Sequence, residues 1–310
     1  MKLLIVANYN LGHFSPFIVE QMNALIAGGV CVDTYGIVGK GLWGYLRNFP
    51  GLKRKIHEFH PDLIHAHYGL SGLCANIQRK VPVVTTYHGS DVHSGGWVSK
   101  LSHIAMRLSA YNIFVSKKLI EMSGYKKKNA CVLSCGLDLD VIKEMSRTQA
   151  RAELGLGMNE IIGLFSSSFD NSIKNYPLAK AAIEKLNGVK LIELKNYSRQ
   201  EVNLLMNACD FQLTTSFRES GPLVVKEAMA CGTPIVSVDV GDVKDIIGNT
   251  EGCYIVERTP EEIASKICQA LSFKGKTSGR QRIIDLGLSN DLIAKKLIAI
   301  YEEVLNEKTI

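Results

Sequence analysis

The sequence predicts an α/β protein built of two doubly wound domains, each a parallel sheet with helices on both faces. Short apolar runs that suit buried strands alternate with segments of helical periodicity along almost the whole chain. The length of 310 residues is about twice that of a typical domain. The two halves also differ in charge: residues 1–150 hold 17 Lys+Arg and 9 Asp+Glu, a net charge of +8, whereas residues 151–310 hold 19 and 21, a net charge of −2. We therefore expect two domains with different tasks.

The elements of the first half follow one another as strand and helix. Leu3–Ala7 is an apolar run typical of a buried strand, and apolar residues recur at helical spacing over Phe17–Ile26 until Gly28 and Gly29 end the helix. Later strands are expected over 30–35, 61–66, 81–87, 113–115 and 132–133, and later helices over 45–59 and 70–79.

The pattern restarts in the second half after a polar connecting helix over 147–157, which Gly155 and Gly157 end. Strands are expected over 161–165, 189–194, 211–215, 234–238 and 254–256, and helices over 177–186, 199–208, 224–230, 261–273 and 292–307. The expected division is one domain over 1–150, a second over 151–290, and a C-terminal helix over 291–310 that packs back towards the first domain. Two such domains leave a cleft between them, and ligands of doubly wound sheets bind beyond the carboxyl ends of the strands.

Composition excludes several classes of protein. The longest purely apolar runs are about five residues, whereas a membrane span needs about 20, and the N-terminal run is too short for a secretory leader. The eight cysteines are spread over the chain and read as reduced core thiols. We expect a cytoplasmic protein whose basic first half meets an anionic partner, a phosphorylated substrate or an acidic membrane face, and not nucleic acid.

The strongest local motif runs from Ser216 to Pro234. Its first part leaves an apolar strand, makes a tight turn at Gly221 and Pro222, and enters a helix whose free backbone N–H groups suit a phosphate or sugar oxygen. Glu219 lies in the turn and Glu227 in the helix, with seven residues between them. Two such carboxylates can hydrogen-bond different hydroxyls of one extended ligand. The alternative is one capping and one surface glutamate.

A second motif, Thr85–Asp91, places His88 at the carboxyl end of a buried strand, followed by Gly89 and Asp91. A histidine there can donate a hydrogen bond to a sugar or phosphate oxygen, and the glycine lets backbone approach a ligand. A structural histidine is the alternative.

Two further histidines, His65 and His67, share one face of the preceding strand. Together with His88 they leave open a zinc site and a metal-dependent hydrolase. No His-Glu-x-x-His motif and no second pair of closely spaced cysteines supports a metal site, so none is expected.

Two other strand-to-helix turns carry candidate residues. The polar loop after strand 161–165 ends with Lys174, a counter-charge for a diphosphate or a solvated lysine. The first turn of the chain contains Gly12 and His13 and has one glycine instead of the three of a dinucleotide fingerprint. This turn could face an acceptor or a phosphate.

At these residues the sequence resembles the retaining glycosyltransferases of family four, which have the GT-B fold of two facing Rossmann-like domains. The resemblance rests on the Glu-x7-Glu motif of Glu219 and Glu227, on His-Gly-Ser-Asp at 88–91, and on the segments at 133–138 and 150–156. It extends over nearly the whole chain.

The resemblance implies that the second domain binds a nucleotide-diphosphate sugar and the first an acceptor. Glu219 would contact hydroxyls of the donor sugar, Glu227 the nucleotide ribose, and His88 the sugar. Lys174 corresponds to the family's diphosphate-binding lysine, and Ser168 stands where the family has an arginine. The remaining donor-side residues would be Gly221, Pro222 and Leu223 at the diphosphate and Asn196 and Tyr197 at the base; Gly12, His13 and Asp91 would lie on the acceptor side.

The implied reaction is transfer of a hexose with retention, from a donor such as a UDP- or GDP-sugar to a glycan or lipid-linked acceptor in surface polysaccharide assembly. It uses no cofactor and no metal ion. A nucleotide-sugar 2-epimerase of the same architecture is the alternative. The apolar and basic residues of 97–111, with lysines at 117–118 and 126–128, also suggest peripheral contact with an anionic membrane at its inner face.

Overall fold

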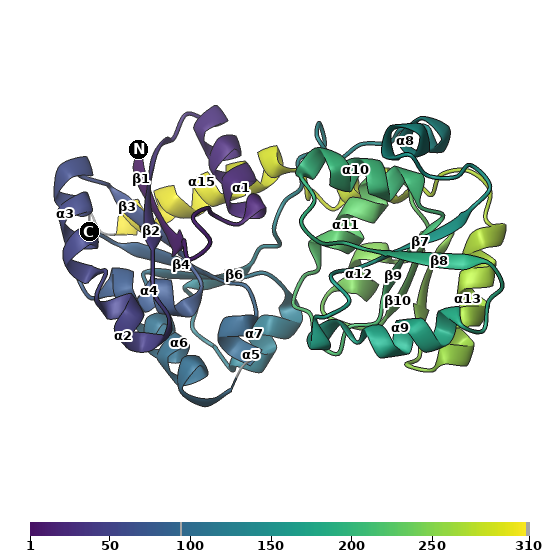
Figure 1. The fold of residues 1–310 in the computed structure, drawn as a ribbon. Coiled ribbons are helices and arrows are strands. Elements are labelled where there is room, and N and C mark those ends of the chain that lie inside the picture. Colours follow the sequence, from purple (N-terminus) through teal and green to yellow (C-terminus); the bar gives the residue numbers. More distant parts are fainter. Residues whose placement is uncertain (94, 308–310) are drawn as a thin grey trace. The chain divides into compact units, whose positions relative to one another are not determined.

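The computed structural model describes residues 1–93 and 95–307 and divides the chain into two compact units (Figure 1). The first unit comprises Met1–Gly136 together with the C-terminal segment from Asn290, and the second unit is Leu137–Ser289. The second unit therefore begins before the boundary expected near residue 150, because the connecting helix belongs to it. The C-terminal helix belongs to the first unit.

The first unit contains a parallel sheet of six strands in the order β2-β1-β3-β4-β5-β6. Its strands are β1 (Lys2–Asn8), β2 (Cys31–Ile37), β3 (Leu63–His67), β4 (Val83–Tyr87), β5 (Tyr111–Phe114) and β6 (Ala130–Val132). Because β1 pairs with both β2 and β3, the strand order reverses at β1. The carboxyl ends of β1, β3 and β4 therefore border the edge at which doubly wound sheets bind ligands.

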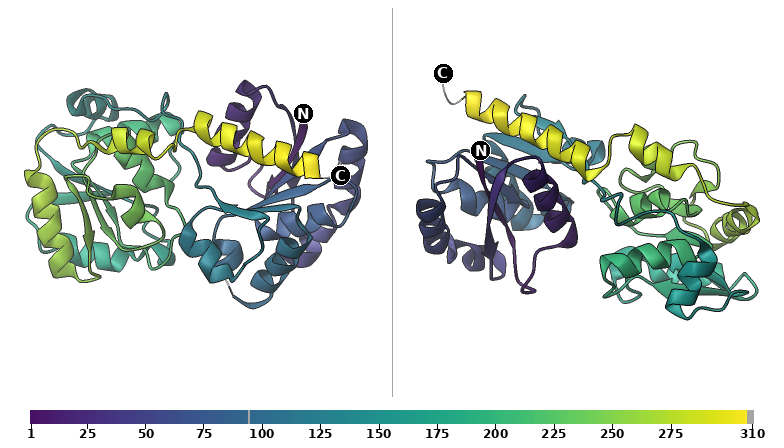
Figure 2. Two further views of the ribbon diagram at one scale, coloured as in Figure 1. Left: turned by 180° about the vertical axis from the view of Figure 1, so that it is seen from behind. Right: turned by 90° about the horizontal axis from the view of Figure 1, so that it is seen from above.

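Helices cover both faces of this sheet. They are α1 (Pro16–Ala27), α2 (Gly41–Leu46), α3 (Phe49–Phe59), α4 (Gly69–Asn76), α5 (Ser90–His93), α6 (Gly96–Leu108), α7 (Lys117–Ser123) and α15 (Asn290–Glu307). The C-terminal helix α15 packs beside α1 on one face (Figure 2). Helices α2, α3 and α6 pack around α4.

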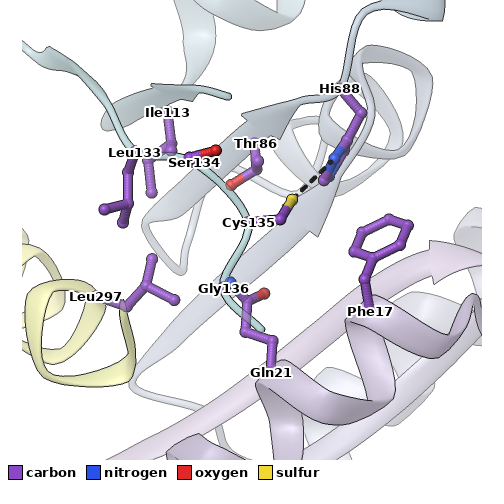
Figure 3. A pocket seen from close by; sticks show the side chains of 10 residues that line it. All are labelled: Phe17, Gln21, Thr86, His88, Ile113, Leu133, Ser134, Cys135, Gly136 and Leu297. Atoms are coloured by element: carbon purple, nitrogen blue, oxygen red, sulfur yellow. Dashed lines mark hydrogen bonds between the residues drawn. The ribbon is translucent and has the colours of Figure 1, made fainter. Parts of the chain in front are cut away.

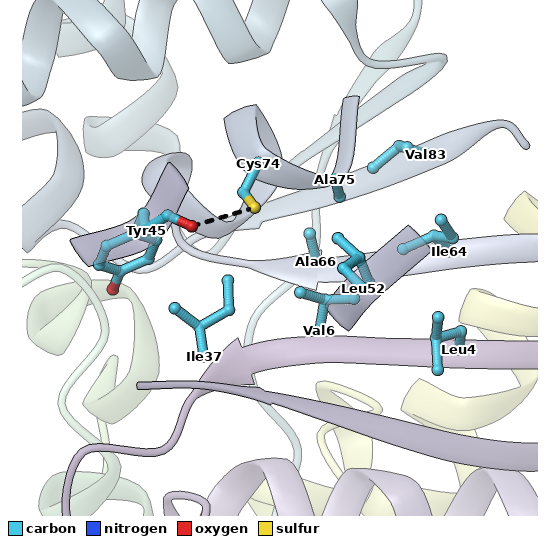
Figure 4. Close-up of a cluster of buried hydrophobic side chains, with 10 residues drawn as sticks. All are labelled: Leu4, Val6, Ile37, Tyr45, Leu52, Ile64, Ala66, Cys74, Ala75 and Val83. Atoms are coloured by element: carbon cyan, nitrogen blue, oxygen red, sulfur yellow. Dashed lines mark hydrogen bonds between the residues drawn. The ribbon is translucent and has the colours of Figure 1, made fainter. Parts of the chain in front are cut away.

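The core between the sheet and α2–α4 explains why the apolar runs become strands. Alternate residues of β1, such as Leu4 and Val6, lie fully buried beside Ile64 of β3, and Leu52 of α3 and Cys74 of α4 pack over them (Figure 4). The residues that alternate with them, Leu3 and Ile5 of β1 and His65 of β3, are also buried, as expected for a parallel sheet covered on both faces.

The second unit contains a parallel sheet in the order β11-β10-β9-β7-β8. Its strands are β7 (Ile161–Phe165), β8 (Val189–Glu193), β9 (Phe211–Thr214), β10 (Ile235–Val238) and β11 (Cys253–Val256). Its helices are α8 (Arg147–Leu154), the 3-10 helix η1 (Ser172–Lys174), α9 (Tyr176–Ile183), α10 (Arg199–Ala208), α11 (Leu223–Ala230), α12 (Val243–Ile247), α13 (Pro260–Ser272) and α14 (Gly279–Asp285). Both units thus have the doubly wound architecture predicted from the alternation.

The helix predicted over 45–59 is instead two helices, α2 and α3. The break falls at Asn48, whose side-chain amide donates to the carbonyls of Val38 and Gly44, while Pro50 occupies the first turn of α3. An asparagine that bonds to nearby backbone competes with helix continuation, and proline is tolerated at a helix start.

The cysteines and the apolar helices bear on two predictions made from the composition. All eight cysteines are free thiols, but only three are buried and Cys31 and Cys268 are exposed, so the prediction of core thiols is wrong for these two. Among the described residues, no helix combines the length and the apolar character needed to cross a membrane.

Candidate functional site

The loops that follow β7 and β9 carry the candidate residues of the second unit. These two strands are neighbours, and β8 lies on the far side of β7, so the strand order reverses between them. Because ligands of such sheets bind at this reversal, residues 166–175 and 215–222 lie where a donor site is expected.

Lys174 and Glu219 meet across these two loops. The Lys174 Nζ lies 2.6 Å from the Glu219 Oε1, and the side chains are 19% and 13% exposed. The same carboxylate oxygen accepts a hydrogen bond of 2.7 Å from the Ser216 hydroxyl. The structure therefore brings together two residues that the sequence proposed separately.

Backbone contacts fix the two loops against each other. The Thr215 hydroxyl donates to the carbonyls of Lys174 and Asn175, at 2.9 and 3.0 Å, and the Phe217 N–H donates to the Ile173 carbonyl at 2.9 Å. Asn175 adopts a left-handed backbone with φ 55°, which asparagine tolerates better than most residues. Both loops are thus held in one conformation.

Arg258, which follows β11, supports the Glu219 loop from behind. Its guanidinium donates to the carbonyls of Ser216 and Thr215, at 2.6 and 3.3 Å, and lies over the Phe217 ring at 5.9 Å from the centroid. It binds three consecutive residues just before Glu219 and so orients that carboxylate.

Glu227 lies inside α11 with its side chain 5% exposed. Arg199, the first residue of α10, places its guanidinium 2.5 Å from the Glu227 carboxylate. A cation at a helix start is disfavoured by the helix dipole, so an arginine there indicates a specific anionic partner. That signal was available in the sequence for Arg199, although neither Arg199 nor Arg258 was among the predicted site residues.

The other donor-side candidates lie on the same loops or beside them. Gly221 and Pro222 precede α11, and Leu223 is its first residue. Asn196 has a left-handed backbone with φ 60° in the turn between β8 and α10, and the neighbouring Tyr197 is exposed.

Ser168 supplies no positive charge at the position where the family has an arginine. Its side chain hydrogen-bonds to Asp170, which also forms an ion pair with Lys195 at 2.8 Å. The bonds from Lys195 and then Ser168 lower the pKa of Asp170. A second cation, Lys195 in the turn after β8, therefore reaches the loop after β7, but the Asp170 carboxylate of that loop engages it.

In the first unit, His88 lies where β4 ends and lines a small pocket with Phe17, Gln21 and Cys135 (Figure 3). Its Nε2 is 3.0 Å from the His67 Nδ1, and the Cys135 Sγ is 3.9 Å from its Nδ1. The Phe17 ring packs on it with centroids 4.9 Å apart. His88 is therefore held in place on several sides.

The two histidines of β3 have different surroundings. His65 is fully buried, and its ring nitrogens bond to the hydroxyls of Tyr301 and Thr86 at 2.6 and 2.7 Å. His67 contacts His88 through Nδ1, while its Nε2 is buried and has no hydrogen-bond partner among the described residues. Burial lowers the pKa of His67 to about 3 and that of His65 and His88 well below the usual value. All three are thus neutral near pH 7.

The alternative of a metal-dependent hydrolase has no support in this arrangement. Both nitrogens of His65 are engaged by hydroxyls, and His67 faces His88 ring to ring. Within residues 1–93 and 95–307, no group of three His, Cys, Asp or Glu side chains is placed to hold a metal ion.

Asp91 organises backbone around His88. Its buried carboxylate accepts N–H bonds from Gly89, Gly69 and His88, at 2.8, 3.1 and 3.4 Å. Burial raises its pKa to about 6, although these bonds oppose the shift. The carboxylate thus ties the backbone at Gly69 to the turn that carries His88.

Gly12 and His13 lie exposed in the loop between β1 and α1. Gly12 has φ 75°, which glycine adopts without strain. The His13 ring contacts the Phe14 carbonyl at 3.1 Å. Neither residue lines the His88 pocket.

Known solved structures share this fold across nearly the whole chain. A sucrose-phosphate synthase from Thermosynechococcus elongatus superposes with a TM-score of 0.86 over 99% of this chain and 100% of that chain, at 16% identity. HepE from Anabaena, solved in complex with UDP, has a TM-score of 0.73 over 98% and 100%, at 17% identity. The chain therefore has the two-domain, Rossmann-like GT-B fold that the resemblance implied.

Two family models match consecutive parts of the sequence. The model described as Glycosyltransferase Family 4 matches residues 20–141, and the one described as Glycosyl transferases group 1 matches residues 153–285. The chain belongs to the group 1 glycosyltransferases of the family-four type.

Two curated relatives are similar in sequence. TuaC of Bacillus subtilis, assigned by name to teichuronic acid biosynthesis as a glycosyltransferase, is 27% identical over 247 residues, covering 69% of this chain and 62% of the relative. A D-inositol 3-phosphate glycosyltransferase of Mycobacterium tuberculosis is 27% identical over 228 residues, covering 58% and 47%. The chain thus spans about half to three fifths of the relatives it matches.

Proposed function

We propose that the protein transfers a hexose, with retention of anomeric configuration, from a nucleoside diphosphate sugar to a glycan or lipid-linked acceptor in surface polysaccharide assembly. The observation that carries the proposal is the Lys174–Glu219 pair at the strand-order reversal of the second sheet, directly before the helix that contains Glu227. A cation and two carboxylates supply the groups that a diphosphate and two sets of hydroxyls require.

Each donor-side residue has a task in this proposal. The Glu219 carboxylate accepts hydrogen bonds from hydroxyls of the transferred sugar, and the Glu227 carboxylate accepts them from the ribose hydroxyls. Lys174 breaks its ion pair with Glu219 and binds the diphosphate. Asn196 and Tyr197 border the base. Crystal structures of HepE with UDP and with UDP-glucose support a uridine donor as the first candidate.

The chemistry is the exchange of one bond at the anomeric carbon. The bond from this carbon to the diphosphate oxygen breaks, and a bond from the acceptor hydroxyl oxygen forms on the same face. The electron pair leaves with the nucleoside diphosphate, whose departing oxygen takes the proton of the acceptor hydroxyl, and Lys174 and the N–H groups at the start of α11 stabilise the charge of the diphosphate. No cofactor and no metal ion takes part, so activity persists in excess chelator.

The acceptor is assigned to the first unit, where His88 contributes a neutral imidazole that can donate or accept a hydrogen bond. The names of the relatives support an acceptor in cell-surface polymer assembly. A lipid-linked acceptor also calls for peripheral contact of a cytoplasmic enzyme with the inner membrane face.

The test begins with a thermal-shift screen of UDP, GDP and their sugars against the whole protein. A ligand at 100 times its Kd stabilises the folded state by about 2.7 kcal/mol. The best donor is then incubated with and without candidate acceptors, and nucleoside diphosphate release is measured. Release only with acceptor, and a product of unchanged anomeric configuration by NMR, supports the proposal. A nucleotide sugar converted into its isomer without acceptor would instead identify a 2-epimerase.

A further inference from the structure

The chain has two tryptophans, and both are exposed on the first unit. Trp43 in α2 is 76% exposed and Trp97 at the start of α6 is 50% exposed. They come from neighbouring surface segments, because a Cβ placed on Gly41 would lie 3.9 Å from the Trp97 ring. Large aromatic side chains are seldom left in water together, and such a patch marks an interaction surface.

The exposed face of α6 extends this patch. Trp97, Lys100, Ile104 and Arg107 follow at intervals of three and four residues, so they share one side of the helix, and all four are exposed. The opposite side, with Ala105 and Met106, is buried. Apolar and cationic side chains therefore alternate along one open face.

The charges on this surface have one sign. Lys40, exposed immediately before α2, joins Lys100 and Arg107. The sequence has no acidic residue between Asp33 and Glu58 and none between Asp91 and Glu121, and these stretches contain the whole surface. A patch of aromatic and basic side chains without carboxylates complements a partner whose outer layer is negatively charged and whose inner layer is apolar. The basic side chains match the charged layer, and the aromatic ones match the apolar layer.

We propose that this α2–α6 surface, defined by Lys40, Trp43, Trp97, Lys100, Ile104 and Arg107, binds an anionic lipid bilayer. Tryptophan is favoured at the interface between lipid and water, and each Lys or Arg near an anionic bilayer raises partitioning about fivefold. A neutral glycan offers the tryptophans a stacking partner but gives the three cations none. The surface gives the proposed membrane contact a definite location, and it takes no part in sugar transfer.

The two tryptophans report the binding directly, because no others contribute to the emission. Titration of the whole protein with vesicles of phosphatidylcholine and phosphatidylglycerol, without any sugar nucleotide, should shift the emission to the blue. Phosphatidylcholine vesicles should give no shift. Raising salt from 0.05 to about 0.5 M should weaken the binding, since the Debye length falls below about 10 Å.

Matched variants test the location. Combined substitution Lys40→Ser, Lys100→Ser and Arg107→Ser should lower co-sedimentation with anionic vesicles at least tenfold. The control removes three lysines of the same unit at 126–128 and should lower it less than threefold. Trp43→Ser and Trp97→Ser should each weaken binding, with thermal unfolding confirming the fold.

Three results would overturn the proposal. They are equal loss in the 126–128 control, an emission shift produced by soluble oligosaccharide and not by vesicles, and a shift that appears on raising protein concentration alone. The last two would identify a glycan platform and a self-association surface. Transfer to a water-soluble acceptor, measured separately, shows whether the proposed reaction itself fails.

Discussion

Lys174 and Glu219 lie 45 residues apart in the sequence and form a 2.6 Å ion pair at the reversal point of the second sheet. Without a donor, each neutralises the other. In the proposed function, donor binding would exchange this pair for contacts with the diphosphate and the sugar hydroxyls.

Lys174→Met should lower kcat by about 10²–10³, because the leaving diphosphate loses one hydrogen-bond donor that stabilises its developing negative charge. Lys180→Met is the matched control, since Lys180 is largely exposed in the neighbouring helix α9. Steady-state kinetics with saturating acceptor measures both. Equal activity of Lys174→Met and Lys180→Met would refute the role of Lys174.

Arg258→Met should lower kcat about tenfold, because the loop that carries Glu219 loses the hydrogen bonds from Arg258 to its backbone carbonyls. Arg258 itself is assigned no contact with the sugar nucleotide. The control is Arg282→Met, whose guanidinium also binds backbone carbonyls, those of Ile246 and Asp245. Both variants should lose similar thermal stability, and only Arg258→Met should lose turnover. A matching loss of kcat in both would reduce Arg258 to a general stabiliser.

Arg199→Met should destabilise the fold by about 3 kcal/mol and raise the KM for the donor, since the buried Glu227 carboxylate loses its cation. Adding Glu227→Gln removes that charge and should restore part of the stability. Urea unfolding of the single and double variants measures the coupling. Purely additive effects would mean that the ion pair contributes nothing.

The buried histidines predict acid sensitivity. His65, His67 and His88 have folded-state pKa values below 6.5, so the unfolded chain binds more protons below that pH. Their contribution is complete above about pH 7 and is lost as pH falls through 6.5, by about 1.4 kcal/mol per pH unit for each histidine.

Asp91 opposes this trend between about pH 4 and 6. Its pKa is raised to about 6, so its contribution is present below 3.8 and is lost as pH rises through 6. The net slope in that window should thus be about one proton smaller than the histidines alone would give. Urea unfolding across pH 4–8 should show it, and His67→Asn should reduce the slope. An unchanged slope in His67→Asn would contradict the assignment.

Most of the fold followed from alternation, because buried parallel strands are short apolar runs that few other structures produce. Several short helices were not predicted, because they give no clear periodic pattern. Helices α7, α12 and α14 span seven, five and seven residues, too few turns for periodicity to appear. The α2–α3 break depended on Asn48 contacts ten residues away.

The site was only partly readable for a related reason. Lys174 and Glu219 belong to motifs whose residue types suggest a ligand. Their ion pair, however, depends on the tertiary structure and could not be predicted from either motif. His65 shared a strand face with His67, and tertiary contacts distinguish the two, among them the bond from His65 to Tyr301, 236 residues later. Partners so distant in sequence leave no local pattern.

The second unit is nested within the first. The chain leaves the first unit after Gly136 and returns at Asn290, and at that junction Leu137 pairs with Ser289. Both ends of the inserted segment therefore emerge side by side, so residues 137–289 can be excised as one continuous cassette. The remainder can be closed by splicing Gly136 to Asn290. If the second unit binds the donor, as proposed, grafting the corresponding segment of a relative between Gly136 and Asn290 should change donor preference and keep the Tyr301–His65 bond of the first unit.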